Sequence, residues 1–383
     1  MPTVRLVSRH SSNGSGADLT TGTSGATVRA SLDRVCIVMM SALGDAVHVL
    51  PVLTALKRHR PDAHVSWILQ PGPATLVRGH PDIGEILLFE RSNGWRAYND
   101  LRRQLATRRF DLVMALQVYL KAGMITRMVR APVKLGFDMA RARDLNWVFT
   151  NAQVQPHTMQ HVQDQYLEFL DALGVPHGAP VWSLGPWPHE LGQQRERLRV
   201  FDRPIAPIVV ATSKAQKDWL PERWAAVCDA LYGDFGLQPV LVGGRSDREI
   251  AAERVILQQA KVPVVSALGS GLRGLVQLLD GAALVLSPDT GPLHITVALD
   301  RPVVSLIGYS NPKRVGPYRK FHDLMIDAYG EPGEEYPISM ENRLNRMPRI
   351  SVADVLSKVQ HWKTTYAATC GERSPGAASV LSG

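Results

Sequence analysis

From Val35 onward, the chain alternates short apolar runs with longer amphipathic segments. Apolar runs of strand length predict buried strands of a parallel sheet, and the segments between them are long enough to form helices. In the first half, strands are predicted at Val35–Met40, His64–Leu69, Glu85–Phe89, Asp111–Leu116 and Val133–Gly136. Helices are predicted at Ala46–Arg60, Gly94–Arg108 and Met159–Leu173.

The second half restarts the same alternation. Strands are predicted at Ile208–Thr212, Pro239–Val242, Ala283–Ser287, Val303–Ile307 and Leu324–Asp327, and helices at Pro221–Tyr232, Leu272–Leu279, Pro292–Leu299 and Val352–Ala367. This pattern predicts the α/β class, with two Rossmann-like doubly wound domains facing a central cleft. Ligands of such folds bind at the carboxyl ends of strands, so the chemistry is expected in the loops that follow strands.

Proline and glycine divide the chain. They become frequent between Pro176 and Pro188, which predicts an interdomain linker there. We expect a disordered tail at 1–30, a first domain at 31–175, the linker at 176–204, a second domain at 205–350, a C-terminal helix at 351–367 and a second disordered tail at 368–383.

The composition fits this picture and adds an expected location. The chain has 383 residues, of which 45% are hydrophobic and 20% charged, as in globular proteins of two domains. Cys36, Cys228 and Cys370 lie far apart, which favours a reducing compartment and argues against a disulfide framework or a cysteine zinc site. The polar N-terminus resembles no signal peptide, and no apolar stretch has the ~20 residues that span a bilayer. We therefore expect a cytoplasmic protein.

The formal net charge of +8 favours an acidic partner without naming one. A phosphorylated substrate and an anionic membrane surface fit the charge equally well. Nucleic acid is not predicted as a partner, because there is no basic run with interleaved aromatics and no zinc-finger or RNP pattern.

Two strand-to-helix loops carry the strongest candidate chemistry. The sequence MMSALGD places Asp45 at or next to a helix N-cap, where it either caps the helix or acts as a general base that the helix terminus holds ionised. The sequence SPDTGPLH places Asp289, Thr290 and Gly291 at a second helix start, which is a ready site for a pyrophosphate. His294 either reaches a phosphate or is simply packed in the first turn.

Two further loops of the second half follow predicted strands. Thr212, Ser213 and Lys217 offer hydroxyls and an ammonium that could neutralise a leaving diphosphate, although a loop lysine is commonly just solvated. After Gly243 and Gly244, the carboxylates Asp247 and Glu249 either bind sugar hydroxyls or form an acidic first helical turn. The sequence lacks GxGxxG, GxxxxGK[ST], DxD and HExxH motifs, so no motif calls for NAD, a P-loop nucleotide or a metal ion.

Four segments together resemble glycosyltransferase family 9, the family of the ADP-heptose:lipopolysaccharide heptosyltransferases. They are SALGDAVHVLPVLTAL from Ser41, ATSKAQKDW from Ala211, VLVGGRSDRE from Val240 and SPDTGPLHITVAL from Ser287, and LIGYSNPKRVGPY from Leu306 also looks like that family. The resemblance spans about Val35 to Trp362 in the family's order.

The resemblance implies a GT-B fold and an inverting transfer from a nucleotide sugar, with ADP-heptose favoured, and with no metal ion or other cofactor. Asp45 matches the general base. The matches on the donor side are Thr212, Ser213, Lys217, Asp289, Thr290, Gly291, His294 and, by a looser spacing, Glu249.

By the same resemblance, the first domain binds the anionic inner core of lipopolysaccharide, a glycolipid, with transient contact at the inner-membrane surface. Candidate acceptor contacts are the basic residues Lys57, Arg58, Arg60, Lys121, Arg141 and Arg143. Family members often carry a basic residue just before the SxLGD turn, where this chain has Met39 and Met40. The donor loop also has Pro292 where leucine is frequent, and the polar tail before Val35 has no counterpart.

Two other functions stay open at this stage. A nucleotide-sugar epimerase could share the architecture, with additional acid–base carboxylates and histidines in the cleft. A non-catalytic protein that binds a nucleotide sugar or a lipid core could use the same loops, and replacing Asp45 by Asn would distinguish it from a transferase.

Overall fold

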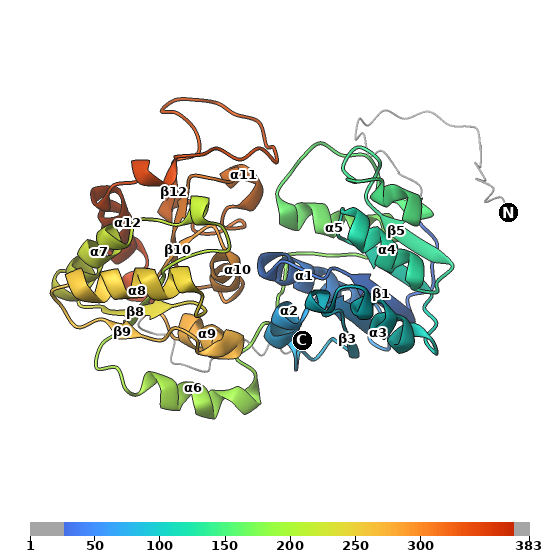
Figure 1. Cartoon of the computed structure of the whole chain (residues 1–383), viewed down its shortest axis with the longest axis horizontal. Coiled ribbons are helices and arrows are strands. Elements are labelled where there is room, and N and C mark those ends of the chain that lie inside the picture. Colours follow the sequence, from blue (N-terminus) through green and yellow to red (C-terminus); the bar gives the residue numbers. More distant parts are fainter. Residues whose placement is uncertain (1–26, 371–383) are drawn as a thin grey trace, which may run out of the picture.

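The computed structural model describes residues 27–370, so most of the two predicted tails lies outside the described residues. Two halves lie side by side, with helices α1 and α10 facing each other between them (Figure 1). Among the described residues, each half contains one six-stranded sheet, and every strand pairing between named strands is parallel.

The two sheets share one topology. Their strand orders are β3-β2-β1-β4-β5-β6 and β12-β11-β10-β7-β8-β9, which is the doubly wound order of dinucleotide-binding folds repeated in each half. The strands are β1 (Arg34–Val38), β2 (His64–Leu69), β3 (Glu85–Leu88), β4 (Leu112–Ala115), β5 (Val133–Gly136), β6 (Ala152–Gln153), β7 (Ile205–Val209), β8 (Gln238–Val242), β9 (Val265–Ser266), β10 (Val285–Pro288), β11 (Val303–Ile307) and β12 (Met325–Asp327). The predicted α/β fold of two Rossmann-like units is confirmed.

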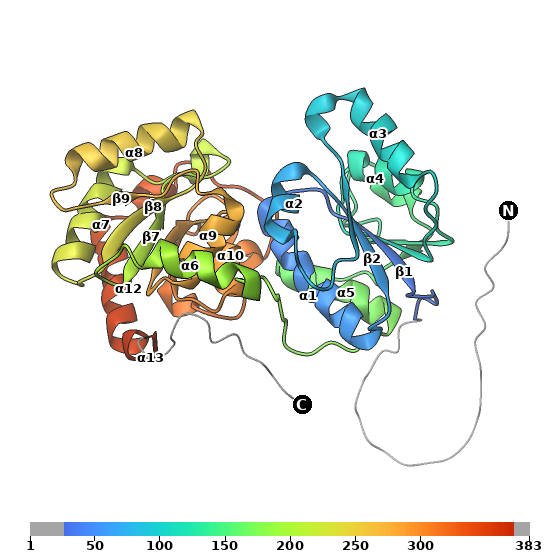
Figure 2. The same cartoon turned by 90° about the horizontal axis from the view of Figure 1, so that it is seen from below.

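Helices cover both faces of each sheet. They are α1 (Leu43–His59), α2 (Pro71–Val77), α3 (Trp95–Leu105), α4 (Leu120–Met128), α5 (Val162–Leu173), α6 (Leu191–Leu198), α7 (Pro221–Gly233), α8 (Asp247–Gln259), α9 (Gly271–Asp280), α10 (Gly291–Ala298), α11 (Pro312–Val315), α12 (Val352–Thr365) and α13 (Ala367–Cys370). In Figure 2, α1 and α5 lie on one face of the first sheet, and α3 and α4 lie on the other. None of the helices in residues 27–370 has the length and apolar character needed to cross a membrane.

Each central strand contains a run of apolar residues because helices bury both faces of its sheet. In β1, Val35 and Ile37 belong to the core between the two halves, whereas Cys36 and Val38 belong to the outer core beneath α3 and α4. The inner core is continuous from the first half into the second, where it includes Leu293 of α10. Apolar burial therefore holds the two halves together as well as each half separately.

The structure differs from the predicted elements in three places. The predicted linker contains helix α6, whose Gln194 side chain donates to the Gln277 carbonyl and to Asp280, so α6 packs on the second half. Strand β7 begins at Ile205, ahead of the predicted run, although Pro207 within it cannot donate to the ladder. The edge strands β6 and β9 have two residues each, too few to give a hydrophobic pattern.

Candidate active site

The loop after β1 places Asp45 in the first turn of α1, three residues after the N-cap residue Ala42. Its Oδ2 atom accepts a hydrogen bond from the backbone N–H of Ala42 at 2.8 Å. Its Oδ1 atom accepts from the hydroxyl of Tyr166, which reaches it from α5 at 3.2 Å. The carboxyl group therefore caps the helix and is also held from a second element.

Burial raises the pKa of Asp45 above its ordinary value. The hydrogen bonds from Ala42 and Tyr166 and the positive charges of Arg314 and Lys217 act in the opposite direction but do not cancel this effect. The hydrogen bond at the helix terminus favours the ionised form, as expected from the sequence, whereas burial has the larger, opposite effect on the pKa of Asp45. A carboxylate with a raised pKa is a stronger proton acceptor once ionised.

The loops of the second half meet because β7 and β10 are neighbours where the strand order reverses. The ammonium of Lys217, after β7, lies 2.6 Å from Oδ2 of Asp289, after β10, and also donates to the Asp289 carbonyl at 3.4 Å. Both side chains are largely buried, at 18% and 6% exposure. The ion pair fixes a lysine at the start of α10.

The Thr212 loop is held by its own hydrogen bonds. The N–H of Thr212 donates to Asp218 at 2.6 Å, and its hydroxyl donates to the Lys214 carbonyl at 2.7 Å. Arg248 of α8 donates to the Thr212 carbonyl at 2.7 Å and pairs with Asp218. Ser213 is exposed at the tip of this loop. Thr212 therefore shapes the loop, and Ser213 keeps its hydroxyl at the surface.

Helix α10 begins with donors suited to an anion. Thr290 is its N-cap residue, and its side chain makes no capping hydrogen bond in the described structure. Gly291 is the first helical residue, Pro292 carries no N–H, and the Leu293 N–H donates to the Thr290 carbonyl at 3.0 Å, so the Gly291 N–H is the donor that this first turn points toward a phosphate. Phosphate binding at this helix start stays a prediction.

Glu249 lies in a capping box at the start of α8. Its carboxylate accepts from the N–H of Gly244 at 2.6 Å and from the N–H and hydroxyl of Ser246 at 2.8 and 2.6 Å. Asp247 occupies the acidic first turn of the same helix. These contacts fit the helix-capping interpretation of the loop, and a sugar contact by Glu249 stays a prediction.

The starts of α1 and α10 fit against each other through two glycines. A Cβ atom at Gly44 would lie 2.7 Å from Cδ2 of His294, and one at Gly291 would lie 2.6 Å from Cδ2 of Leu43. Each half therefore supplies a glycine that accommodates a side chain of the other. The two loops that the sequence placed in separate halves are in direct contact.

Three buried histidine rings extend from this contact. The ring of His48 lies 4.5 Å from that of His294 and 5.6 Å from that of His161, between ring centroids. Burial lowers the pKa of all three, to about 3 for His161 and His294, so the rings are neutral near pH 7. No three His, Cys, Asp or Glu side chains within residues 27–370 are grouped so as to hold a metal ion.

His161 connects the two halves. Its Nδ1 atom accepts from the N–H of Gln163 at 3.1 Å and caps α5, while its Nε2 atom donates to the carbonyl of Gly316 at 3.0 Å. Neither His48 nor His161 was predicted to have a function from the sequence. His48 lies inside the SALGDAVHVLP motif, three residues after Asp45, which was the one available signal.

A cavity of about 290 Å³ lies beside Asp45. It is lined mainly by thioether, aliphatic and aromatic groups of the first half, with Arg314 and Met340 contributed by the second half. The lining residues are Met39, Ser41, Ala42, Asp45, Leu116, Gln117, Val118, Tyr119, Phe137, Arg141, Met159, Val162, Gln165, Tyr166, Arg314 and Met340.

The predicted acceptor contacts are distributed unevenly around this cavity. Arg141 lines it, but its guanidinium is paired with Asp138 at 2.5 Å and Glu168 at 2.6 Å. Arg143 donates to the sulfur of Met340 at 3.1 Å, so it lies at the rim. Lys121 is exposed at the start of α4.

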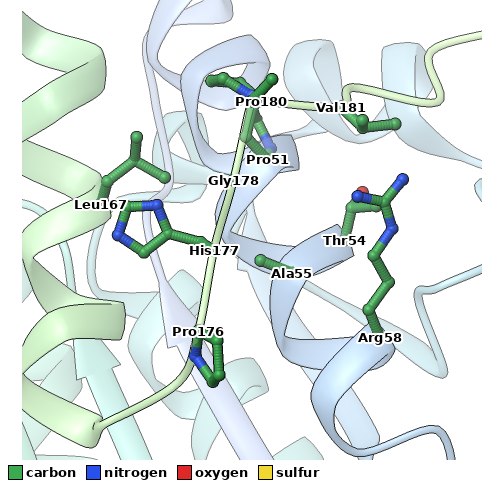
Figure 3. Close-up of a pocket in the computed structure, with 11 residues that line it drawn as sticks. Pro51, Thr54, Ala55, Arg58, Leu167, Pro176, His177, Gly178, Pro180 and Val181 are labelled. Carbon is green, nitrogen blue, oxygen red and sulfur yellow. The ribbon is translucent and has the colours of Figure 1, made fainter.

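The remaining three basic residues lie at the opposite end of α1, roughly 18 Å along the helix from Asp45. Lys57 donates to the Ala63 carbonyl at 2.9 Å, and Arg60 pairs with Asp33 at 2.7 Å. Arg58 lines a separate small cavity of about 90 Å³ between α1 and the chain at 176–181 (Figure 3). The structure does not bring these residues to the Asp45 cavity.

Comparison with known proteins adds a family to this geometry. Residues 98–336 match the model of glycosyltransferase family 9 (heptosyltransferase). The chain is 28% identical over 336 residues to the lipopolysaccharide core heptosyltransferase OpsX of Haemophilus influenzae, covering 85% of this chain and 96% of the relative. It is 28% identical over 299 residues to lipopolysaccharide heptosyltransferase 1 of Escherichia coli K12, covering 75% and 91%.

Solved structures agree with these sequence matches. The family 9 glycosyltransferase of Veillonella parvula superposes with a TM-score of 0.74 at 20% identity, covering 88% of this chain and 98% of the other. Escherichia coli heptosyltransferase WaaC with ADP superposes with a TM-score of 0.68 at 25% identity, covering 88% and 99%. With a family match over more than half of its length and this two-domain architecture, the chain belongs to glycosyltransferase family 9 and is a glycosyltransferase.

Proposed function

We propose that the protein transfers a heptosyl group from ADP-heptose to an anionic glycolipid acceptor of the lipopolysaccharide core. The transfer inverts the anomeric carbon and needs no metal ion. Residues 205–350 bind the nucleotide sugar, and residues 31–175 bind the acceptor at the membrane surface. The relatives support the substrate classes, since they are heptosyltransferases of lipopolysaccharide, and WaaC has been solved with ADP and with ADP-2-deoxy-2-fluoro heptose.

One observation carries the mechanism. A buried carboxyl group with a raised pKa, at the start of α1, lies where that helix meets the start of α10 and its Lys217–Asp289 ion pair. The proposed base therefore belongs to the start of α1 and the proposed anion site to the start of α10, and these two helix starts contact each other. A displacement reaction needs this arrangement, because the nucleophile and the leaving group must lie on opposite faces of the anomeric carbon.

In the proposed reaction, Asp45 accepts the proton of an acceptor hydroxyl as its oxygen forms a bond to the anomeric carbon. The bond from that carbon to the diphosphate breaks on the opposite face, and ADP leaves with the electron pair. Lys217 and the N–H group of Gly291 stabilise the negative charge that develops on the diphosphate. Tyr166 orients the Asp45 carboxyl group.

The first experiment tests the donor. The protein is incubated with ADP-heptose and an inner-core acceptor, the product is identified by mass spectrometry, and its anomeric configuration is read by NMR. We expect transfer with inversion that survives EDTA. Thermal stabilisation by UDP-sugars but not by ADP-sugars would contradict the heptose assignment.

The second experiment tests the base. Asp45→Asn should lower kcat by about 100-fold or more, because general-base catalysis typically contributes 10²–10⁴-fold, while donor affinity changes little. Calorimetry with ADP gives the binding control. Full transfer activity in Asp45→Asn would refute the assignment of Asp45 as the base. If the wild-type protein bound ADP-heptose but showed no turnover, it would be a binding protein and not a transferase.

A further inference from the structure

Arg314 brings a positive charge from the donor half to the cavity beside Asp45. It lies in the short helix α11, is half-buried and lines the cavity. Its charge acts on the Asp45 carboxyl group, yet among the described residues no carboxylate lies within ion-pair distance of its guanidinium. Its Nε–H group is buried and has no hydrogen-bond partner within residues 27–370.

The segment around Arg314 is fixed on both halves. Asn311 caps α11 through the Lys313 N–H at 3.1 Å and donates to the Pro337 carbonyl at 2.8 Å. Gly316 receives the hydrogen bond of His161 described above. Because these contacts lie on either side of Arg314, they hold the backbone from which its side chain lines the cavity.

A second contact strengthens this docking. The Tyr318 hydroxyl donates to Asp164 of α5 at 2.5 Å, and Arg319 pairs with the same carboxylate at 3.1 Å. Segment 311–319 of the second half is therefore seated on the start of α5 in the first half.

Asp45 is the carboxylate of the lining on which the Arg314 charge acts, but the two side chains form no ion pair within residues 27–370. Arg141, the other arginine in the lining, is already neutralised by Asp138 and Glu168. Met39 and Phe137 offer apolar contacts, and Ser41, Gln117 and Gln165 add neutral polar groups. The Arg314 guanidinium therefore has no ion-pair partner among the described residues, and an anionic ligand in the cavity would gain charge-assisted hydrogen bonds to its terminal N–H groups.

We propose that Arg314 binds an anionic group of the acceptor, a carboxylate or a phosphate, and thereby sets acceptor specificity from the donor half. The planar guanidinium matches either anion through two parallel hydrogen bonds. This proposal rests on the proposed transferase function, whose acceptor hydroxyl must reach Asp45. The acceptor site is complete only when segment 311–319 is docked on α5.

The test compares wild type, Arg314→Met and Arg314→Lys on three acceptors with ADP-heptose as donor. The acceptors are a delipidated inner-core oligosaccharide, the same compound with its carboxylates amidated, and the same compound dephosphorylated. Arg195→Met, which removes an exposed arginine of α6 outside the cavity, controls for the loss of one charge.

We expect Arg314→Met to raise the acceptor KM at least tenfold and to leave the donor KM within twofold. Wild type should lose a similar factor on whichever modified acceptor lacks the contacted anion, and Arg314→Met should lose nothing further there. Arg314→Lys should recover part of the affinity, and it carries the same comparison should the methionine variant fold poorly. Arg195→Met should match wild type.

An unchanged acceptor KM in Arg314→Met, or an equal loss by wild type and variant on both modified acceptors, would overturn the proposal. Equilibrium binding of the three oligosaccharides, measured by calorimetry, separates this result from a failure of the transferase function. A wild-type protein that turns over no donor, yet binds the native acceptor at least tenfold more tightly than Arg314→Met does, would refute the function and keep the anion contact.

Discussion

At the scale of single residues, Asp45 both caps α1 and lines the cavity, so its capping contact leaves it at the site where we propose that it acts as the base. Its hydrogen bond to Ala42 is the local, helix-forming contact, and its bond to Tyr166 comes from α5. Burial raises the pKa of Asp45, and each hydrogen bond to the carboxylate opposes that rise. The number of such bonds therefore decides at which pH the base becomes ionised.

Tyr166→Phe tests this balance. Loss of the hydroxyl removes a donor to the carboxylate, so the pKa of Asp45 rises further and the acidic limb of kcat/KM moves to higher pH. The value of kcat near pH 7 should fall on the order of tenfold. The pH–rate profile is the measurement, with Tyr98→Phe on α3 as the control. An acidic limb that does not move would show that Tyr166 does not act on Asp45.

At the scale of elements, the contact between the starts of α1 and α10 requires glycine in both. Gly44→Ala or Gly291→Ala would force a methyl group to within 2.7 or 2.6 Å of a side chain of the opposite half. We expect each variant to lose about 1–3 kcal/mol of unfolding free energy and most of its activity. Gly72→Ala in α2 is the control, because no atom of the part of the chain that the structure describes lies within 4 Å of its added methyl group.

Urea unfolding and turnover measure these effects. The idea of a tight contact fails if Gly44→Ala is as stable as Gly72→Ala. It also fails if Gly44→Ala and Gly291→Ala both retain full turnover.

His161 links α5 to segment 311–319 and should make stability depend on pH. Its pKa is lowered from 6.5 to about 3 by burial, so between these values the unfolded chain binds the proton and the folded chain does not. Stability therefore falls as pH drops below 6.5, by up to about 1.4 kcal/mol per pH unit for this histidine. His48 and His294 contribute in the same direction, whereas the raised pKa of Asp45 acts in the opposite one.

His161→Asn should reduce this dependence. Asparagine can still cap α5 but does not titrate and is too short to keep the bond to Gly316. Urea unfolding at pH 5 and pH 7 should give a smaller difference for the variant than for wild type. An equal difference would mean that His161 is protonated at its ordinary pKa in the folded protein.

Most elements could be predicted because their signals are local. The strands of each half follow from apolar runs, and the loops at Asp45 and Asp289 follow from capping chemistry at strand ends. The partners of these residues could not be predicted in this way. Tyr166 is 121 residues from Asp45 in sequence, and the ion pairs of Arg141 depend on how α5 packs. The basic residues predicted from sequence as acceptor contacts therefore include Arg141, which is already paired, and Lys57 and Arg58, which lie at the end of α1 away from Asp45.

At the scale of the whole molecule, Arg273 of α9 connects the halves on the side away from segment 311–319. Its guanidinium pairs with the buried Glu190, lies 3.7 Å from the ring centroid of Trp187 and donates at 2.9 Å to the carbonyl of Leu76 in the first half. The connecting chain is thus fixed to both halves next to the point where it crosses between them.

Arg273→Met should cost on the order of 3 kcal/mol of unfolding free energy, because it leaves Glu190 buried without its partner. Adding Glu190→Gln to this variant should recover part of the loss. Chemical denaturation measures the free energies, and small-angle scattering should report a larger radius of gyration for the single variant. If Arg273→Met lost less than about 0.5 kcal/mol of unfolding free energy, Arg273 would not be an important link between the halves.

The glycines at the starts of α1 and α10, each of which accommodates a side chain of the other half, limit which halves can be joined in a chimeric protein. Leu43 and Gly291 form one matched pair, and Gly44 and His294 form the other, with each pair divided between the halves. A chimera that takes one half from a distant relative would combine unmatched partners, even if both parents fold and react. Restoring these four positions together, rather than the reactive side chains, should be what makes such a hybrid enzyme work.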